Sequence, residues 1–316
     1  MIFTLENLRY LTLWINRLSM LLGFIIGMGY TYLAMPGPMG IVGGLLTASA
    51  HLMLMWITSN NALGYTAHTA YPGVVITLGI LATLLSSFSV FIHTYYSMML
   101  LAPLLPLPTV FILGLSILIA VCCTVSNLLF SAVQLSRPYR ETPAWMEQKI
   151  LSFSNVTSVL HTLITLGHIW ALEGSISSFF MGLILSLCDL IVLYLFNHHL
   201  LISSTPAAPA QTATTFSDTA QRYAYMGLSV ICILGSKIGS CIVYYQGTML
   251  LGLALGFPVS FALAMAVSTA TIATFAGILF STSQAYDLYK RFFPAPAPAP
   301  TVTEDIPEPA LLAPQF

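Results

Sequence analysis

No Asp, Glu, Lys or Arg occurs between Arg17 and Arg137. A soluble domain carries about 25% charged residues, whereas only 6% of this 316-residue chain is charged and 57% of it is hydrophobic. A stretch of this kind folds only in apolar surroundings, so the composition predicts an integral, multi-pass membrane protein whose main partner is the lipid bilayer. The formal net charge of −1 and the lack of a basic patch interleaved with aromatic residues predict that the chain binds no nucleic acid.

The apolar runs are long enough to cross a bilayer several times, because a helical span needs roughly 20 apolar residues. Prolines that disfavour a continuing helix separate several of the runs. We therefore predict an all-α fold, a polytopic transmembrane helical bundle of about eight spans. The predicted spans lie near residues 12–35, 38–58, 73–100, 108–135, 152–171, 175–201, 223–246 and 249–283.

Composition divides the chain into four parts. Residues 1–202 hold spans one to six, and residues 223–293 hold spans seven and eight. Between them, residues 203–222 form a predicted cytoplasmic linker rich in Ser, Thr, Pro and Ala. Residues 294–316 form a Pro/Ala-rich cytoplasmic tail, which either stays disordered or docks a cytoplasmic partner. The sequence is also compatible with a homo-oligomer.

The basic residues outside the spans predict the orientation of the chain. Apart from Lys237, the basic residues lie at the start of the chain and after spans four, six and eight, which puts all of them on one face of an eight-span bundle. Cytoplasmic loops carry an excess of Lys and Arg. The charge distribution therefore predicts that both termini are cytoplasmic.

Lys237 is the only charged residue between Arg222 and Asp287, and it lies in the middle of span seven. An ammonium group at the bilayer centre costs about 2.5–3.5 kcal/mol on insertion scales, and intramembrane ionisable residues commonly mark functional sites. Asp189 lies near the centre of span six. Consecutive spans are commonly antiparallel neighbours, so the two groups are expected at similar depth, either as a functional pair or as an ion pair that fixes helix register.

Small residues surround the lysine. Gly235 and Gly239 form a G-x-x-x-G spacing, with Ser236 between them. The spacing either allows close helix packing or leaves room beside Lys237 for a ligand.

Histidines provide further candidates. His51 and His161 are either a polar lining or proton relay, or packing residues with satisfied hydrogen bonds. His161 and His168 lie seven residues apart, which exceeds the i, i+4 spacing of two ligands on one helix. The five cysteines lie inside apolar runs without a C-x-x-C spacing. We predict no metal site, and the lack of hydrolase and nucleotide-binding motifs predicts no enzyme activity and no catalytic residues.

Several segments resemble the heliorhodopsins, relatives of the microbial rhodopsins that hold retinal as a Schiff base with a cytoplasmic N-terminus. RYAYMGLSVICILGSKIGSCIVYYQGTM, with Lys237, is similar to the last helix of that family. SSFFMGLILSL resembles the start of its sixth helix, and LLTASAHLML, with His51, its second. LLSSFSVFI and TVSNLLFSAVQL are similar to its third and fourth helices.

The resemblance implies seven rhodopsin-like helices plus one C-terminal span. It further implies that Lys237 binds retinal within a pocket that includes Ser86, Ser87, Gly235, Ser236 and Gly239. The family places a glutamate counterion in its third helix, whereas this chain has no acid between Glu6 and Glu141. If Lys237 binds retinal, either the role of counterion or relay passes to Asp189, with His51 and His161 as further candidates, or the Schiff base stays largely neutral.

Three functions remain open from the sequence. The first is a photoreceptor that uses retinal for light-driven signalling or ion conduction. The second is a retinal-free channel or secondary transporter that uses Lys237 and Asp189 for ion transport. The third is a structural subunit of a membrane complex.

Overall fold

The protein is described by a computed structural model that covers residues 5–62, 72–136, 144–201 and 216–293. This described part contains eight α-helices, one short 3-10 helix at Ala102–Leu104 and no strand. The α-helices are α1 (Leu5–Ala34), α2 (Pro38–Ala62), α3 (Pro72–Leu101), α4 (Thr109–Ser136), α5 (Ala144–Glu173), α6 (Ile176–Leu201), α7 (Phe216–Ala254) and α8 (Val259–Phe292). All eight are long and apolar enough to cross a membrane, so the predicted all-α, multi-pass membrane protein is confirmed.

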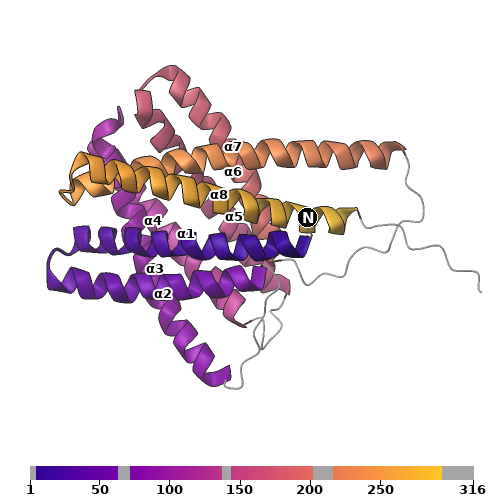
Figure 1. Ribbon diagram of the computed structural model, residues 1–316, viewed down its shortest axis with the longest axis horizontal. Coiled ribbons are helices and arrows are strands. Elements are labelled where there is room, and N and C mark those ends of the chain that lie inside the picture. Colours follow the sequence, from indigo (N-terminus) through magenta and orange to yellow (C-terminus); the bar gives the residue numbers. More distant parts are fainter. Residues whose placement is uncertain (1–4, 63–71, 137–143, 202–215, 294–316) are drawn as a thin grey trace, which may run out of the picture.

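Helices that follow one another in sequence form the closest pairs. α1 packs on α2, α3 on α4, α5 on α6 and α7 on α8, and α8 also returns to pack on α1. In Figure 1, α1, α2, α7 and α8 run along the long axis of the molecule. The first turns of α1 and the last turns of α8 lie at the same end of the bundle (Figure 1). The cytoplasmic location of that end stays a prediction.

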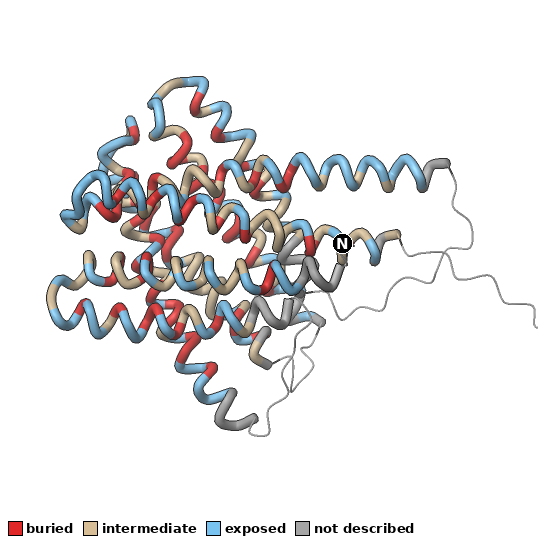
Figure 2. The backbone as a smooth tube through the Cα atoms, in the orientation of Figure 1, coloured by how far each residue is buried: buried red, intermediate tan, exposed pale blue. Residues whose placement is uncertain are grey.

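The third and fifth helices are the most enclosed. Of the membrane-spanning windows, 44% of the α5 window and 39% of the α3 window are buried, against 22% for α1, α4, α6 and α7. The largest apolar core cluster joins α3, α4 and α5 through residues such as Met98, Ile119 and Ile164. Figure 2 shows exposed residues along the outer sides of the helices, where apolar side chains such as Leu84 and Ile231 would contact lipid. The centre of the bundle therefore lies along α3 and α5.

The boundary between the last two spans differs from the prediction, which placed it at residues 247–248. α7 continues through Gly247 and ends at Ala254. The turn comes at Gly256, whose φ of 78° lies in the left-handed region that favours glycine. Hydrogen bonds from Phe257 N to Gly252 O and from Gly256 N to Leu253 O close the helix end, as in a Schellman motif. Gly247 lies within an apolar run without a second breaking signal, so the helix does not end there.

The start of α7 also differs from the predicted linker of residues 203–222. The helix begins at Phe216, and its first turns extend beyond the neighbouring helices as an exposed rod (Figures 1 and 2). The rest of the predicted linker and the predicted tail at 294–316 lie outside the described residues.

Candidate functional site

Asp189 is buried at the centre of the bundle's C-terminal half. Only 6% of its surface is exposed, and its Oδ1 accepts a hydrogen bond of 2.8 Å from the hydroxyl of Ser236. Ser236 is itself fully buried, and it lies on α7 directly before the lysine. The bond therefore joins α6 to α7 at the level of both predicted charges.

Lys237 is half-buried, and its side chain lies against α8. A Cβ atom added at Gly277 would come within 3.0 Å of the lysine Cδ, 3.3 Å of Cε and 3.4 Å of Nζ. The missing side chain at Gly277 thus leaves the space that the lysine occupies. Lys237 was predicted from sequence, whereas its neighbour on α8 was not.

The two charges interact without direct contact. Asp189 is the charged group that acts on Lys237 electrostatically. Among the described residues, however, no direct ion pair joins the Lys237 ammonium to the Asp189 carboxylate. The carboxylate is held by Ser236 and the ammonium lies beside Gly277, so the structure brings the charges to neighbouring positions and keeps them apart.

The two glycines around Lys237 serve close helix contacts. A Cβ at Gly235 would lie 2.6 Å from Cys188 Sγ on α6. A Cβ at Gly239 would lie 3.1 Å from Thr165 Cγ2 on α5 and 3.6 Å from Leu185 Cβ on α6. These contacts match the packing role of small residues in membrane helices. Neighbouring side chains occupy the space beside both glycines.

His51, Ser86, Ser87 and Asn127 form a separate polar cluster on α2, α3 and α4. His51 Nδ1 and Ser86 Oγ share a hydrogen bond of 2.8 Å. Asn127 on α4 donates from Nδ2 to Ser87 Oγ at 2.9 Å and to Ser86 Oγ at 3.4 Å. The structure thus brings together three residues predicted for the pocket or relay and adds Asn127, but these contacts do not include Lys237.

A second polar network, centred on His168, was missed by the sequence reasoning. Its Nδ1 lies 3.2 Å from Gln246 Oε1 on α7, and its Nε2 lies 3.4 Å from Ser97 Oγ on α3. Tyr30 on α1 donates to Gly247 O at 3.5 Å and also interacts with Ser97. We name Tyr30, Ser97, His168 and Gln246 the His168 network; it joins α1, α3, α5 and α7. The available signal was Gln246, an amide inside an apolar run that needs a buried partner.

Metal ligands do not gather in the part of the chain that the structure describes. No group of three or more His, Cys, Asp or Glu side chains comes together there in a way that could hold a metal ion. The described cysteines are free thiols.

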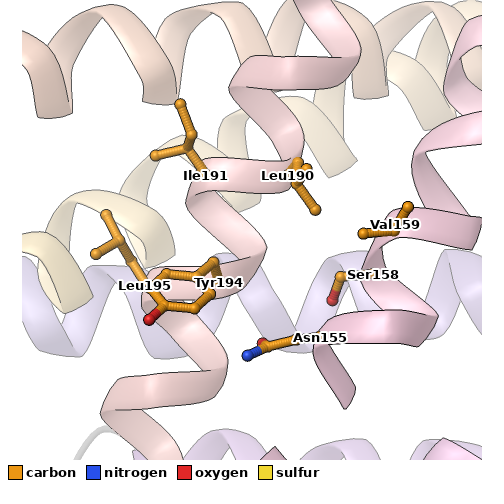
Figure 3. A pocket seen from close by; sticks show the side chains of 7 residues that line it. All are labelled: Asn155, Ser158, Val159, Leu190, Ile191, Tyr194 and Leu195. Carbon is orange, nitrogen blue, oxygen red and sulfur yellow. The ribbon is translucent and has the colours of Figure 1, made fainter. Parts of the chain in front are cut away.

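An open groove lies between α5 and α6 (Figure 3). It has a volume of about 370 Å³ and a mostly apolar lining. Its lining residues are Asn155, Ser158, Val159, Leu190, Ile191, Tyr194 and Leu195. Because Val159, Ile191 and Tyr194 are exposed on the outside of the bundle, the groove faces the surroundings of the protein rather than the Lys237 site.

The fold and the site together define an all-helical, multi-pass membrane protein with a buried aspartate and a half-buried lysine inside neighbouring spans. Comparison of the chain with protein-family models, with curated proteins and with solved structures finds no match.

Proposed function

We propose that this protein is a membrane transport protein, a channel or secondary transporter, in which Lys237 and Asp189 act on the transported charge. The observation that carries the proposal is the buried Asp189 carboxylate next to an ammonium group with which it forms no direct ion pair. We refer to the two residues as the Lys237–Asp189 pair.

The energetics favour a functional pair over a purely structural one. Each charge costs about 2.5–3.5 kcal/mol at the bilayer centre, and a structural pair offsets that cost best through direct contact and full hydrogen bonding. Asp189 instead accepts a hydrogen bond from Ser236 and stays apart from the ammonium. A carboxylate in this state has oxygen lone pairs that a proton or a cation can use.

Transport would follow from a change in the partner of each charge. When a cation or proton binds Asp189, its attraction for Lys237 falls, and the relative position of α6, α7 and α8 can change. A bound ion shifts such an equilibrium only as far as it binds one arrangement more tightly than the other. The contacts of Asp189 with α7 and of Lys237 with α8 are those that would differ between the two arrangements.

The distribution of basic residues supports a cytoplasmic location for the end that holds the first turns of α1 and the last turns of α8. Arg17, Arg222 and Lys290 lie toward this end of their helices. The positive-inside rule places such an end in the cytoplasm. Accessibility of single added cysteines to an impermeant thiol reagent in intact cells tests this orientation.

The transport proposal is tested with the full chain in liposomes. Gradients of protons, sodium, potassium and chloride are applied in turn, and the current is recorded for the wild type and for Lys237→Met and Asp189→Leu. We expect a current with at least one gradient, and its loss in both variants. No current in the wild type with any of the four ions, or equal currents in the variants, would overturn the proposal and favour a structural subunit.

A retinal protein is the second candidate, and two observations favour it. Lys237 lies on α7, the helix that the heliorhodopsin resemblance assigns to the retinal lysine. Asp189 acts electrostatically on Lys237, as a counterion of a protonated Schiff base would. Against this, the lysine side chain lies along Gly277 of α8, a helix that the resemblance does not include.

An absorption spectrum separates the two candidates. The protein is produced with all-trans retinal, and its visible spectrum is read before and after addition of hydroxylamine. A red-shifted band that hydroxylamine bleaches, and that Lys237→Ala lacks, supports the retinal protein. If no band forms, Lys237 has no Schiff base and the retinal-free transporter stands.

A further inference from the structure

Three polar side chains in the middle of the bundle keep exposed surface although they lie on the inward faces of their helices. They are His93 on α3, His161 on α5 and Tyr244 on α7. In a helix, residues four or seven positions apart lie on the same face. The burial of the residues at these spacings therefore shows which way His93, His161 and Tyr244 each point.

His93 lies on the inward face of α3. Ser86, seven residues earlier, and Ser97, four residues later, are 0% and 6% exposed. The lipid-facing side of the same helix is marked by Leu84 and Phe88, which are 56% and 46% exposed. The exposed surface of His93 therefore faces the interior of the bundle. The centroid of the Tyr30 ring on α1 lies 4.5 Å from the centroid of the His93 ring.

His161 shows the same pattern on α5. Ser154, seven residues earlier, is 5% exposed, and His168, seven residues later, is fully buried. His161 is exposed between them. Since α5 has the largest buried share of all the spans, this surface also belongs to the interior.

Tyr244 extends the pattern to α7. It is 42% exposed, whereas Thr248 and Leu251 on the same face are each 2% exposed. Lys237 lies seven residues earlier on this face, and Asp189 acts on the Tyr244 hydroxyl electrostatically. The exposed surface of Tyr244 thus reaches the neighbourhood of the Lys237–Asp189 pair.

Electrostatic interactions place the histidines near one another. His93 interacts with His51, His161 and His168, which lie on α2 and α5. Exposed surface on facing helices, at positions enclosed by buried residues, requires an internal space that admits water-sized molecules.

We infer that His93, His161 and Tyr244 line a hydrated chamber that carries protons to Asp189. The inference rests on the proposed transport function and names the proton as the ion that couples to it. Neutral imidazole accepts a proton at one ring nitrogen and releases the proton of the other, so each histidine passes one proton without a net change. Water in the chamber relays it, and the Tyr244 hydroxyl gives its proton to the carboxylate as it accepts another.

Other titratable groups lie close to the three chamber residues. Tyr30 (α1), His51 (α2) and His168 (α5) interact with His93, and Cys123 (α4) interacts with Thr94, the residue after His93. Asp189 (α6) interacts with Tyr244 and with Lys237 (α7). Asp189 is the only carboxylate among the groups just named. It is therefore the expected end of the proton path.

The chamber is tested without any transport assay, by radiolytic footprinting of the whole protein in detergent. Hydroxyl radicals formed from bound water oxidise the side chains next to it. Tyr32, 40% exposed on the lipid-facing side of α1, is the matched negative control, and Tyr223, 71% exposed at the start of α7, is the positive control. We expect Tyr244 and His161 to label at a rate close to Tyr223. Labelling as slow as that of Tyr32 would overturn the chamber.

Proton flux into liposomes, read with an internal pH dye under a potassium diffusion potential, tests the path. Blocking the chamber with His161→Phe should lower the flux roughly tenfold or more, and Tyr244→Phe should lower it while Tyr32→Phe does not. Unchanged flux in His161→Phe, or no proton flux in the wild type, would overturn the inference.

The two proposals fail in different ways. If another ion is transported and needs Lys237 but not His161, the proton path fails and the proposed function stands. If Tyr244 labels rapidly and the flux needs His161, but Lys237→Met and Asp189→Leu change nothing, the role of the Lys237–Asp189 pair fails and the chamber stands.

Discussion

Asp189 and His168 are each buried inside a membrane-spanning helix, but their surroundings differ. Both ring nitrogens of His168 have neutral partners, Gln246 and Ser97, and the network joins four helices. Asp189 accepts a bond from Ser236 and lies near an ammonium group without contact. A polar group with all its partners in place stabilises one arrangement of helices, whereas separated charges leave a second arrangement accessible. We therefore expect the His168 network to stabilise the packing of the helices and the Lys237–Asp189 pair to take part in transport.

The largest expected effect concerns the charges. Asp189→Leu leaves Lys237 without a nearby carboxylate and should lower the free energy of unfolding by about 2.5–3.5 kcal/mol, the cost of an uncompensated charge at the bilayer centre. The double variant Lys237→Met/Asp189→Leu removes both charges and should recover most of that loss. Denaturant unfolding in detergent measures both values. If the double variant loses the sum of the two single losses, the charges do not act on each other.

Close packing beside the lysine gives the next effect. Gly235→Ala places a Cβ 2.6 Å from Cys188 Sγ, so α6 and α7 must separate, at a cost of about 1–3 kcal/mol. Gly114→Ala is the matched control, because an added Cβ there meets no atom within 4 Å. Thermal unfolding should show a loss for the first variant alone. Equal melting temperatures would remove the argument for close contact.

The His168 network should give a smaller loss of stability and no loss of function. Gln246→Leu removes one hydrogen bond to His168, and such bonds in membrane proteins contribute about 0.6–1.7 kcal/mol. The liposome current should stay at the wild-type level. A variant with wild-type stability and no current would reverse the roles assigned to the two regions.

A single cation–π contact between α1 and α2 should matter least. The Arg17 guanidinium lies 4.2 Å from the Trp56 ring centroid and 4.9 Å from that of Trp14. Trp56→Leu removes one cation–π contact between α1 and α2, worth about 0.5–1 kcal/mol. Unfolding measured against the wild type checks the value, and a loss as large as that of Asp189→Leu would contradict the ranking.

The sequence predicted the helical class and the number of spans because both depend on the length of apolar runs. It failed at the α7–α8 boundary, where Gly247 lies within the helix and Gly256 forms the turn. Both glycines have apolar surroundings, but only Gly256 has a proline, Pro258, two residues later. A proline just after a glycine is typical of a helix C-terminus, so Pro258 was the signal to use.

The site was predictable only in part. An isolated lysine and aspartate in apolar runs stand out in any sequence, so Lys237 and Asp189 were found. The contact of Lys237 with Gly277 depends on how α8 packs on α7, and no residue pattern within either helix specifies it. The partners of His168 lie on α3 and α7, so the network likewise arises from tertiary packing.

The most direct test of the role of the Lys237–Asp189 pair is the ion current of Lys237→Met/Asp189→Leu in liposomes, together with its unfolding free energy. If the pair is purely structural, the double variant keeps the wild-type current; if the pair acts in transport, the current is lost. Our account expects near wild-type stability with no current under the gradient that drives the wild type. A current equal to that of the wild type would contradict it.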